Sequence, residues 1–132
     1  MSDTLAPVEE RLLEALADSA RGPRRNGVFA LWMVVRTCSG VLPPDALSPR
    51  VHRKRLQALE QRLASLSVPA PLKRALSSAV RELADRSGVA AGMALQRLVA
   101  PARETLGSEV GEVIGVAASI AKEASHDHTP AA

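Results

Sequence analysis

Hydrophobic residues along this chain recur mainly at the three- and four-residue spacing of an α-helix. The first stretch predicts a helix from about Pro7 to Ser19, because a proline suits the first helical turn and acidic residues follow it. The next stretch, Gly27 to about Leu42, is apolar on nearly all sides over Val28–Val35, which predicts a helix at the centre of a bundle. A buried strand over Val28–Val35 is the alternative, but no second segment offers a strand to pair with it.

A hairpin of two helices is predicted around Pro69. Ser48 and Pro49 form a cap and first-turn pair, and the leucines beyond them step by three, four and three residues: Leu56, Leu59, Leu63 and Leu66. After Pro69, apolar residues over Leu72–Leu83 line one face and charged residues the other. Because only a short linker joins these helices, we expect them to be antiparallel, with the leucines facing the apolar stripe.

The helical pattern weakens beyond Gly88, and Pro101 predicts a break or kink in a helical segment that runs to about Ala124. Residues 126–132 contain no large apolar side chain and are expected to form a flexible C-terminal tail. The length of 132 residues suits one helical domain, residues 1–125. Together these elements predict an all-α fold, a compact bundle of four or five helices that are mostly antiparallel.

Phe29 and Trp32 are the only aromatic residues in the chain, so the core is expected to be aliphatic, as suits helices packed closely on helices. Cys38 has no second cysteine to pair with, and acidic residues occupy the first twenty positions, where a signal peptide needs a basic start. We therefore expect a cytoplasmic protein. The longest apolar run, Val28–Val35, is far shorter than the roughly 20 residues that span a membrane.

Positive charge is concentrated between Arg21 and Arg55, although the net charge is only +3: eight basic residues stand there against Asp45 as the single acidic one. Arg21–Asn26 combines Gly, Pro and Asn with three arginines and is predicted to be a basic loop. The candidate contacts to a nucleic acid or other anion are Arg21, Arg24, Arg25, Arg50, Arg53, Lys54 and Arg55. If the fold brings them together, affinity for phosphates should fall steeply with salt. A solvated helix face is the alternative, because no aromatic platform accompanies these charges in the sequence.

Small residues recur every four positions near the C-terminus, at Gly107, Gly111, Gly115 and Ser119. They would form a narrow helix face that another helix can approach closely. Each interior glycine costs about 1 kcal/mol relative to alanine, so a close contact is expected to compensate for it. Tight packing within one molecule is one explanation, and self-association or docking of a partner is the other.

The segment Leu83–Val99 resembles in its opening the helix-turn-helix of bacterial repressors, with an alanine four positions before Gly88 and Val89 directly after it. Its second half departs from that pattern, because Arg97 and the small Ala94 stand where apolar residues belong. The helix that would read DNA begins with Ala-Ala-Gly-Met, which offers no amide or guanidinium group to a base edge. An ordinary corner of the bundle is the alternative.

The sequence contains no recognisable catalytic, cofactor or metal motif. Cys38 lies in the most apolar segment, where an inert buried thiol is expected. His52 lies among cations without a carboxylate to orient it, so a surface position is expected. His126, Asp127 and His128 would hold a metal only weakly, because two imidazoles on a flexible tail lack a third rigid ligand.

The sequence therefore favours a non-enzymatic interaction module, an adaptor or regulator, whose partner is another protein or a second copy of itself. Self-association would use the small-residue or leucine helix faces. The alternative is a nucleic-acid-binding regulator that acts through the basic residues between Arg21 and Arg55. A third hypothesis, an enzyme built around Cys38 and His52, requires both side chains in one pocket.

Overall fold

The computed structural model describes residues 4–43 and 46–127, the last three of these by their backbone alone. Six α-helices and no strand occupy these residues: α1 (Ala6–Asp18), α2 (Pro23–Ser39), α3 (Pro49–Ser65), α4 (Ala70–Glu82), α5 (Gly88–Leu106) and α6 (Ser108–Asp127). The all-α prediction is therefore confirmed within the described residues. The predicted number of four or five helices is too low.

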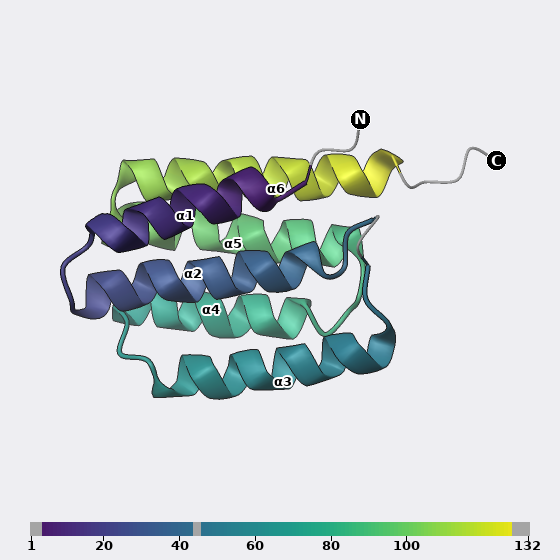
Figure 1. Ribbon diagram of the computed structural model, residues 1–132, viewed down its shortest axis with the longest axis horizontal. Helices are drawn as coiled ribbons and strands as arrows, with labels where there is room; N and C mark the ends of the chain where they lie inside the picture. The colour runs from purple at the N-terminus through teal and green to yellow at the C-terminus, as the bar shows by residue number, and fades with distance from the viewer. Residues whose placement is uncertain (1–3, 44–45, 128–132) are drawn as a thin grey trace.

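The helices form two layers of three (Figure 1). α1, α2 and α3 lie side by side in one layer, which we call the front layer, and α6, α5 and α4 lie behind them in that order. Each helix runs antiparallel to the one before it along the chain, so the predicted hairpin around Pro69 is present as α3 and α4. α1 begins and α6 ends at the same end of the bundle (Figure 1).

α2 lies at the centre of the bundle and packs against every other helix. The predicted central position of Val28–Val35 is confirmed, because eight of the 17 residues of α2 are buried and they point in several directions. Gly27 allows a close approach at the start of the helix. A Cβ atom there would come within 2.9 Å of the Leu106 side chain and 3.0 Å of the Leu72 side chain. Neighbouring helices thus cover one side of α2, while Phe29, Trp32 and Arg36 lie on its outer side.

The start of α2 and the break in the C-terminal segment differ from the prediction. α2 begins at Pro23, so most of the predicted basic loop is its first turn: Gly22 has a φ of +141°, which glycine tolerates, and Pro23 fits the first helical position. The C-terminal segment breaks at Gly107, which has a φ of +104°, and not at Pro101, which lies inside α5. α5 continues past the proline because α4 and α6 pack against it. The segment therefore forms two helices.

Aliphatic side chains fill the space between the two layers, as the scarcity of aromatic residues predicts. The largest fully buried side chains are Leu5, Leu12, Leu31, Leu72, Leu76, Leu83, Leu95, Leu98, Leu106, Ile114, Val8 and Val28. Burying a side chain of this size stabilises a fold by about 1.5–3 kcal/mol. Every helix except α3 supplies at least one of these fully buried side chains.

α3 is the outermost helix of the front layer. It buries only His52, Leu56 and Leu59 among its 17 residues. Grooves run along both of its sides, one of about 540 Å³ against α2 and one of about 440 Å³ against α4. The second half of the predicted leucine seam, Leu63 and Leu66, is accordingly only half-buried.

α6 extends to Asp127, beyond the predicted end near Ala124. It therefore includes the first two residues of the predicted tail, and residues 128–132 lie outside the described part of the chain. Within the described residues, none of the helices combines the length and the hydrophobicity needed to cross a bilayer.

Candidate functional site: an arginine–aromatic groove

The two aromatic residues of the chain lie on the outer side of α2 and not in the core. Phe29 and Trp32 are half-buried, and their rings stack with centroids 5.8 Å apart and an angle of 17° between the ring planes. Large apolar rings gain most by full burial, and aromatic residues left at a surface are enriched at the centres of protein interfaces. The pair therefore marks a candidate contact surface.

Two arginines lie over these rings. The guanidinium carbon of Arg36 is 5.4 Å from the centre of the Trp32 ring, and that of Arg62, from α3, is 5.9 Å from the centre of the Phe29 ring. A cation over an aromatic face gains about 0.5–1 kcal/mol at an exposed site. Both arginines remain exposed, so their guanidinium groups are positioned by the rings and still open to an anionic partner.

A groove of about 540 Å³ runs between α2 and α3 beside the aromatic pair. Met33 and Leu59 supply apolar lining, and Arg55 joins the two ring-covering arginines along it. Trp32 Nε1 is buried and has no hydrogen-bond partner among the described residues. An apolar lining with three guanidinium groups fits a partner that presents an apolar side chain flanked by carboxylates.

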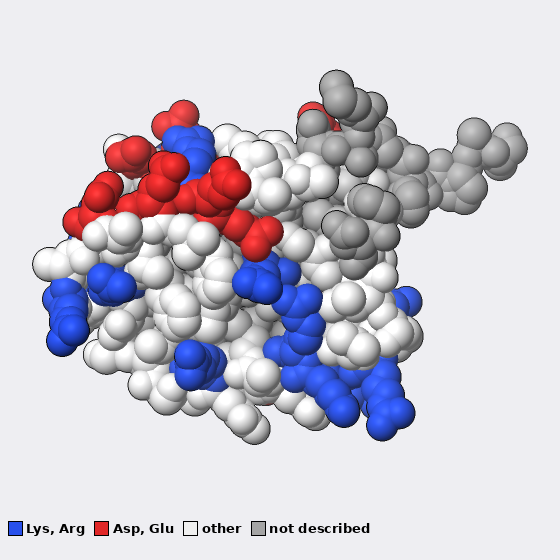
Figure 2. Space-filling model, viewed as in Figure 1, with Lys and Arg blue, Asp and Glu red and all other residues white. Residues whose placement is uncertain are grey.

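Charge is segregated across the molecule. Residues 1–20 and 107–132, which include α1 and α6, contain nine acidic and two basic residues, whereas residues 21–106 contain 15 basic and five acidic residues. Figure 2 shows acidic side chains gathered over α1, with one basic side chain among them, and basic side chains over α3 and at both ends of α2. Uncharged side chains cover most of the surface between them (Figure 2).

These two charged regions form opposite edges of the front layer. The negative edge consists of the exposed residues Glu10, Glu14 and Asp18 of α1, with Glu109 and Glu112 of α6 beside them. The positive edge consists of Arg50, Arg53, Lys54, Arg55 and Arg62 of α3, whereas Arg36 lies on the middle helix, α2, between the two edges. The front layer therefore presents a dipolar surface, with the aromatic pair between its edges.

The structure divides the residues predicted to bind an anion into two groups. The first group is Arg21, Arg24 and Arg25, and the second is Arg50, Arg53, Lys54 and Arg55. The first group lies at the start of α2 and the second at the start of α3, at opposite ends of the bundle (Figure 1). The fold does not bring them together. Arg55 of the second group lines the groove beside the aromatic pair. The sequence does not indicate this proximity, because Phe29 and Trp32 are distant from α3 along the chain.

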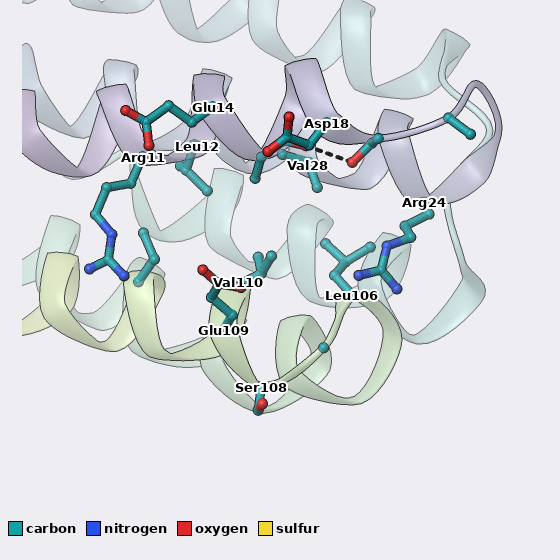
Figure 3. A pocket seen from close by; sticks show the side chains of 15 residues that line it. Arg11, Leu12, Glu14, Asp18, Arg24, Val28, Leu106, Ser108, Glu109 and Val110 are labelled. Carbon is teal, nitrogen blue, oxygen red and sulfur yellow. Dashed lines mark hydrogen bonds between the residues drawn. The ribbon is translucent and has the colours of Figure 1, made fainter.

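Arg24 of the first basic group lines a separate cleft. This cleft, of about 570 Å³, lies between the end of α1, the start of α2 and the start of α6 (Figure 3). Its charged lining residues are Arg11, Glu14, Asp18, Arg24 and Glu109. Arg25 is engaged elsewhere, because its Nη1 donates a hydrogen bond of 3.4 Å to the backbone oxygen of Ser19. Since both signs of charge line the cleft, it does not extend an anion-binding surface.

The predicted stripe of small residues does not form a single face. Gly107 makes the corner before α6, and Gly111 packs on α5, where an added Cβ would lie 2.7 Å from the Cβ of Arg103. Gly115 has open space around it, and Ser119 is exposed. Positions four apart on a helix drift by about 40° per step, so the stripe turns from the α5 contact toward solvent. Packing within the molecule explains Gly111, while docking at Gly115 and Ser119 stays a prediction.

Cys38 and His52 do not share a pocket. Cys38 is completely buried, and burial raises the pKa of its thiol from 9.0 to about 12, so it does not supply a thiolate near neutral pH. His52 is not at the surface as predicted: it is 4% exposed, and its Nε2 donates a hydrogen bond of 2.8 Å to the backbone oxygen of Leu83. It lies four residues before Leu56 and so extends the buried side of α3. The hypothesis of an enzyme built on these two residues is therefore wrong.

The segment that resembles a helix-turn-helix forms the corner between α4 and α5. Its second helix, α5, lies between α4 and α6 in the back layer and buries Ala90, Ala91, Ala94 and Leu95. This part of α5 is packed into the bundle, as expected for an ordinary corner. Among the described residues, no group of three or more His, Cys, Asp or Glu side chains is placed to hold a metal ion. The side chains of His126, Asp127 and His128 lie outside the described part.

No protein-family model, curated protein or solved structure matches this chain. The features of this chain that bear on its function are therefore the groove and the two charged edges of the front layer.

Proposed function

We propose that this chain is a non-enzymatic protein-interaction module whose contact surface is the front layer, centred on Phe29 and Trp32. The observation that carries the proposal is the surface position of the only two aromatic residues, stacked on each other and covered by Arg36 and Arg62. Aromatic residues and arginine are the residue types that dominate the binding energy of protein interfaces. A partner that covers this cluster would remove both rings from water.

Binding there would combine two favourable contributions. A carboxylate of the partner would form charge-assisted hydrogen bonds with the exposed guanidinium groups, which the rings already hold in place. An apolar side chain that enters the groove would gain about 1.5–3 kcal/mol when fully buried. Because the arginines are held before binding, less side-chain entropy is lost when the partner docks.

Capture from cell extract tests this proposal. Immobilised wild-type protein is incubated with nuclease-treated extract beside two charge-reversal variants, Arg62→Glu and Arg103→Glu. Both arginines are exposed and lie in the last turn of their helices, but Arg103 is in the back layer. We expect the Arg103 variant to retain the same proteins as wild type and the Arg62 variant to lose them. Equal retention by all three proteins would contradict the proposal.

A nucleic-acid-binding regulator is the second candidate function. It is favoured by the second basic group at the start of α3, which continues through Arg55 into the groove beside the aromatic pair. Bases can stack on such rings while basic side chains contact phosphates. Fluorescence anisotropy with a labelled single-stranded oligonucleotide tests it. Binding that weakens steeply with salt and is lost in Arg55→Glu would support this candidate, and no binding at low salt would exclude it.

A further inference from the structure

We infer that the partner which covers the front layer is a second copy of this chain, and that the two copies pair face to face about a two-fold axis. This inference rests on the proposed function, because it names the occupant of the same surface. The charge distribution of the front layer, the exposed residues of α1 and the size of the layer each support it.

The charges of the front layer are complementary to those of a second front layer that faces it. Consider two copies with their front layers facing each other and a two-fold axis between them, parallel to the helices. This rotation exchanges α1 and α3 and keeps each position along the helices, so on both sides the acidic residues of α1 face the middle and second half of α3, where Arg62 lies. The same patch is used by both copies, so the assembly closes as a dimer.

The aromatic pair on α2 lies between the two charged edges. α2 is the middle helix of the front layer and would lie along the axis, so the Phe29–Trp32 pair of each copy, with Arg36 over the Trp32 ring, would face the same cluster of the other copy near the centre of the interface. The charged edges would form its rim. An aromatic centre with a charged rim is the usual composition of a protein interface.

α1 presents an apolar side chain flanked by carboxylates, which is what the groove between α2 and α3 is suited to bind. Leu13 is a large apolar residue with 44% of its surface exposed, and it lies beside the exposed carboxylates of Glu10 and Glu14. The groove between α2 and α3 pairs an apolar lining with three guanidinium groups. In the two-fold arrangement, α1 of one copy faces α3 and this groove of the other. Leu13 is therefore the side chain that enters it.

The front layer is also large enough for a stable dimer. A helix of 17 residues, such as α3, is about 25 Å long, and neighbouring helices lie about 9 Å apart. Because α1 has only 13 residues, the three helices side by side present roughly 600 Å² per copy. Stable interfaces bury about 600–1,000 Å² per partner, so the estimate lies at the lower end of that range.

The mass of the purified protein tests the inference first. Light scattering after size exclusion should give twice the monomer mass of 13.9 kDa at low salt. At about 1 M salt, where charges more than about 3 Å apart are screened, it should approach the monomer mass. A wild-type protein that stays monomeric at high concentration and low salt would overturn the inference. The proposed function would survive that result if Arg62→Glu still lost the proteins captured from extract.

Complementary charge reversals test the arrangement itself. One double variant reverses the positive edge (Arg55→Glu with Arg62→Glu), and the other reverses the negative edge (Glu10→Arg with Glu14→Arg). We expect each alone to dimerise more than about tenfold more weakly than wild type, because like charges then meet along both rims. Mixed together, they should form a heterodimer, since every negative edge again meets a positive one.

The control is Arg81→Glu with Arg103→Glu, which makes the same change in charge on α4 and α5 and should dimerise like wild type. Circular dichroism establishes that each variant is folded. Dimerisation that neither edge variant weakens, or a mixture that fails to pair although both variants are folded, would overturn the face-to-face arrangement.

Discussion

The guanidinium carbon of Arg62 lies 5.9 Å from the centre of the Phe29 ring, and this contact joins the outermost helix of the front layer to the central one. α3 buries few side chains of its own, so surface contacts of this kind contribute to its attachment. The same arginine lines the groove beside the aromatic pair. Arg62 therefore has two roles that different measurements separate, one in holding α3 and one in binding.

Replacing Arg62 by alanine should destabilise the fold only slightly. The loss of the contact with Phe29 is expected to lower the free energy of unfolding by about 0.5–1 kcal/mol. Urea denaturation followed by circular dichroism measures this, with Arg103→Ala as the control. A loss of several kcal/mol would show that Arg62 holds α3 far more strongly than this contact can, and capture results for Arg62 variants would then reflect unfolding.

The glycines of α6 should respond to alanine in opposite directions. Gly111→Ala places a Cβ 2.7 Å from the Cβ of Arg103 and 3.0 Å from its Cα, so α5 and α6 must move apart at a cost of about 1–3 kcal/mol. Gly115→Ala meets open space and should stabilise the helix by up to about 1 kcal/mol. Thermal unfolding of the two variants measures both signs. If both substitutions destabilise equally, the packing described for α5 and α6 is incorrect.

His52 should contribute to the stability of the fold through its hydrogen bond to the backbone oxygen of Leu83. In His52→Ala the buried backbone oxygen of Leu83 loses its donor, which is expected to cost about 1–3 kcal/mol. Arg53→Ala, at the exposed neighbouring position, should change stability by less than about 0.5 kcal/mol. Denaturant unfolding of both variants gives the comparison. If the two variants lose a similar free energy of unfolding, His52 does not make this hydrogen bond in solution.

Cys38 should make the fold less stable at alkaline pH. Burial raises the pKa of its thiol from 9.0 to about 12, so the unfolded chain loses this proton at lower pH than the folded one. The contribution to stability is therefore complete below about pH 9 and is lost as the pH rises toward 12, at up to about 1.4 kcal/mol per pH unit. Unfolding measured between pH 8 and 11 should show a smaller slope in Cys38→Ala than in wild type. Identical slopes would mean that the thiol is not buried.

The elements of the fold could be predicted largely from the sequence because hydrophobic spacing reports which side of each helix is buried. Val28–Val35 is the clearest case, since residues apolar on nearly all sides belong to a helix that others surround. The errors arose at Gly22–Pro23 and at Gly107, where a single backbone angle decides where a helix begins or ends. The spacing of apolar residues does not report backbone angles. It therefore does not predict that Gly107 divides the C-terminal segment into two helices and brings the number to six.

The candidate site could not be predicted in the same way, because it joins residues from two helices. Phe29 and Arg62 are more than 30 positions apart, and nothing in the pattern of either segment places one over the other. The charged neighbours of His52 favour a surface position, whereas its spacing of four residues from Leu56 favours the burial that the structure has. The basic residues could be found from composition, but their separation into two groups depends on the lengths and directions of α2 and α3.

Quenching of Trp32 fluorescence by acrylamide shows whether two copies meet at the front layer, because the only tryptophan of the chain lies at the centre of the proposed contact surface. The measurement compares dilute with concentrated wild-type protein at low salt, with the positive-edge double variant as the control. We expect Trp32 to become less accessible to the quencher as the wild-type concentration rises, and to stay equally accessible in the variant. Accessibility that is independent of concentration in wild type, or that falls equally in both proteins, would contradict the claim that two copies meet at the front layer.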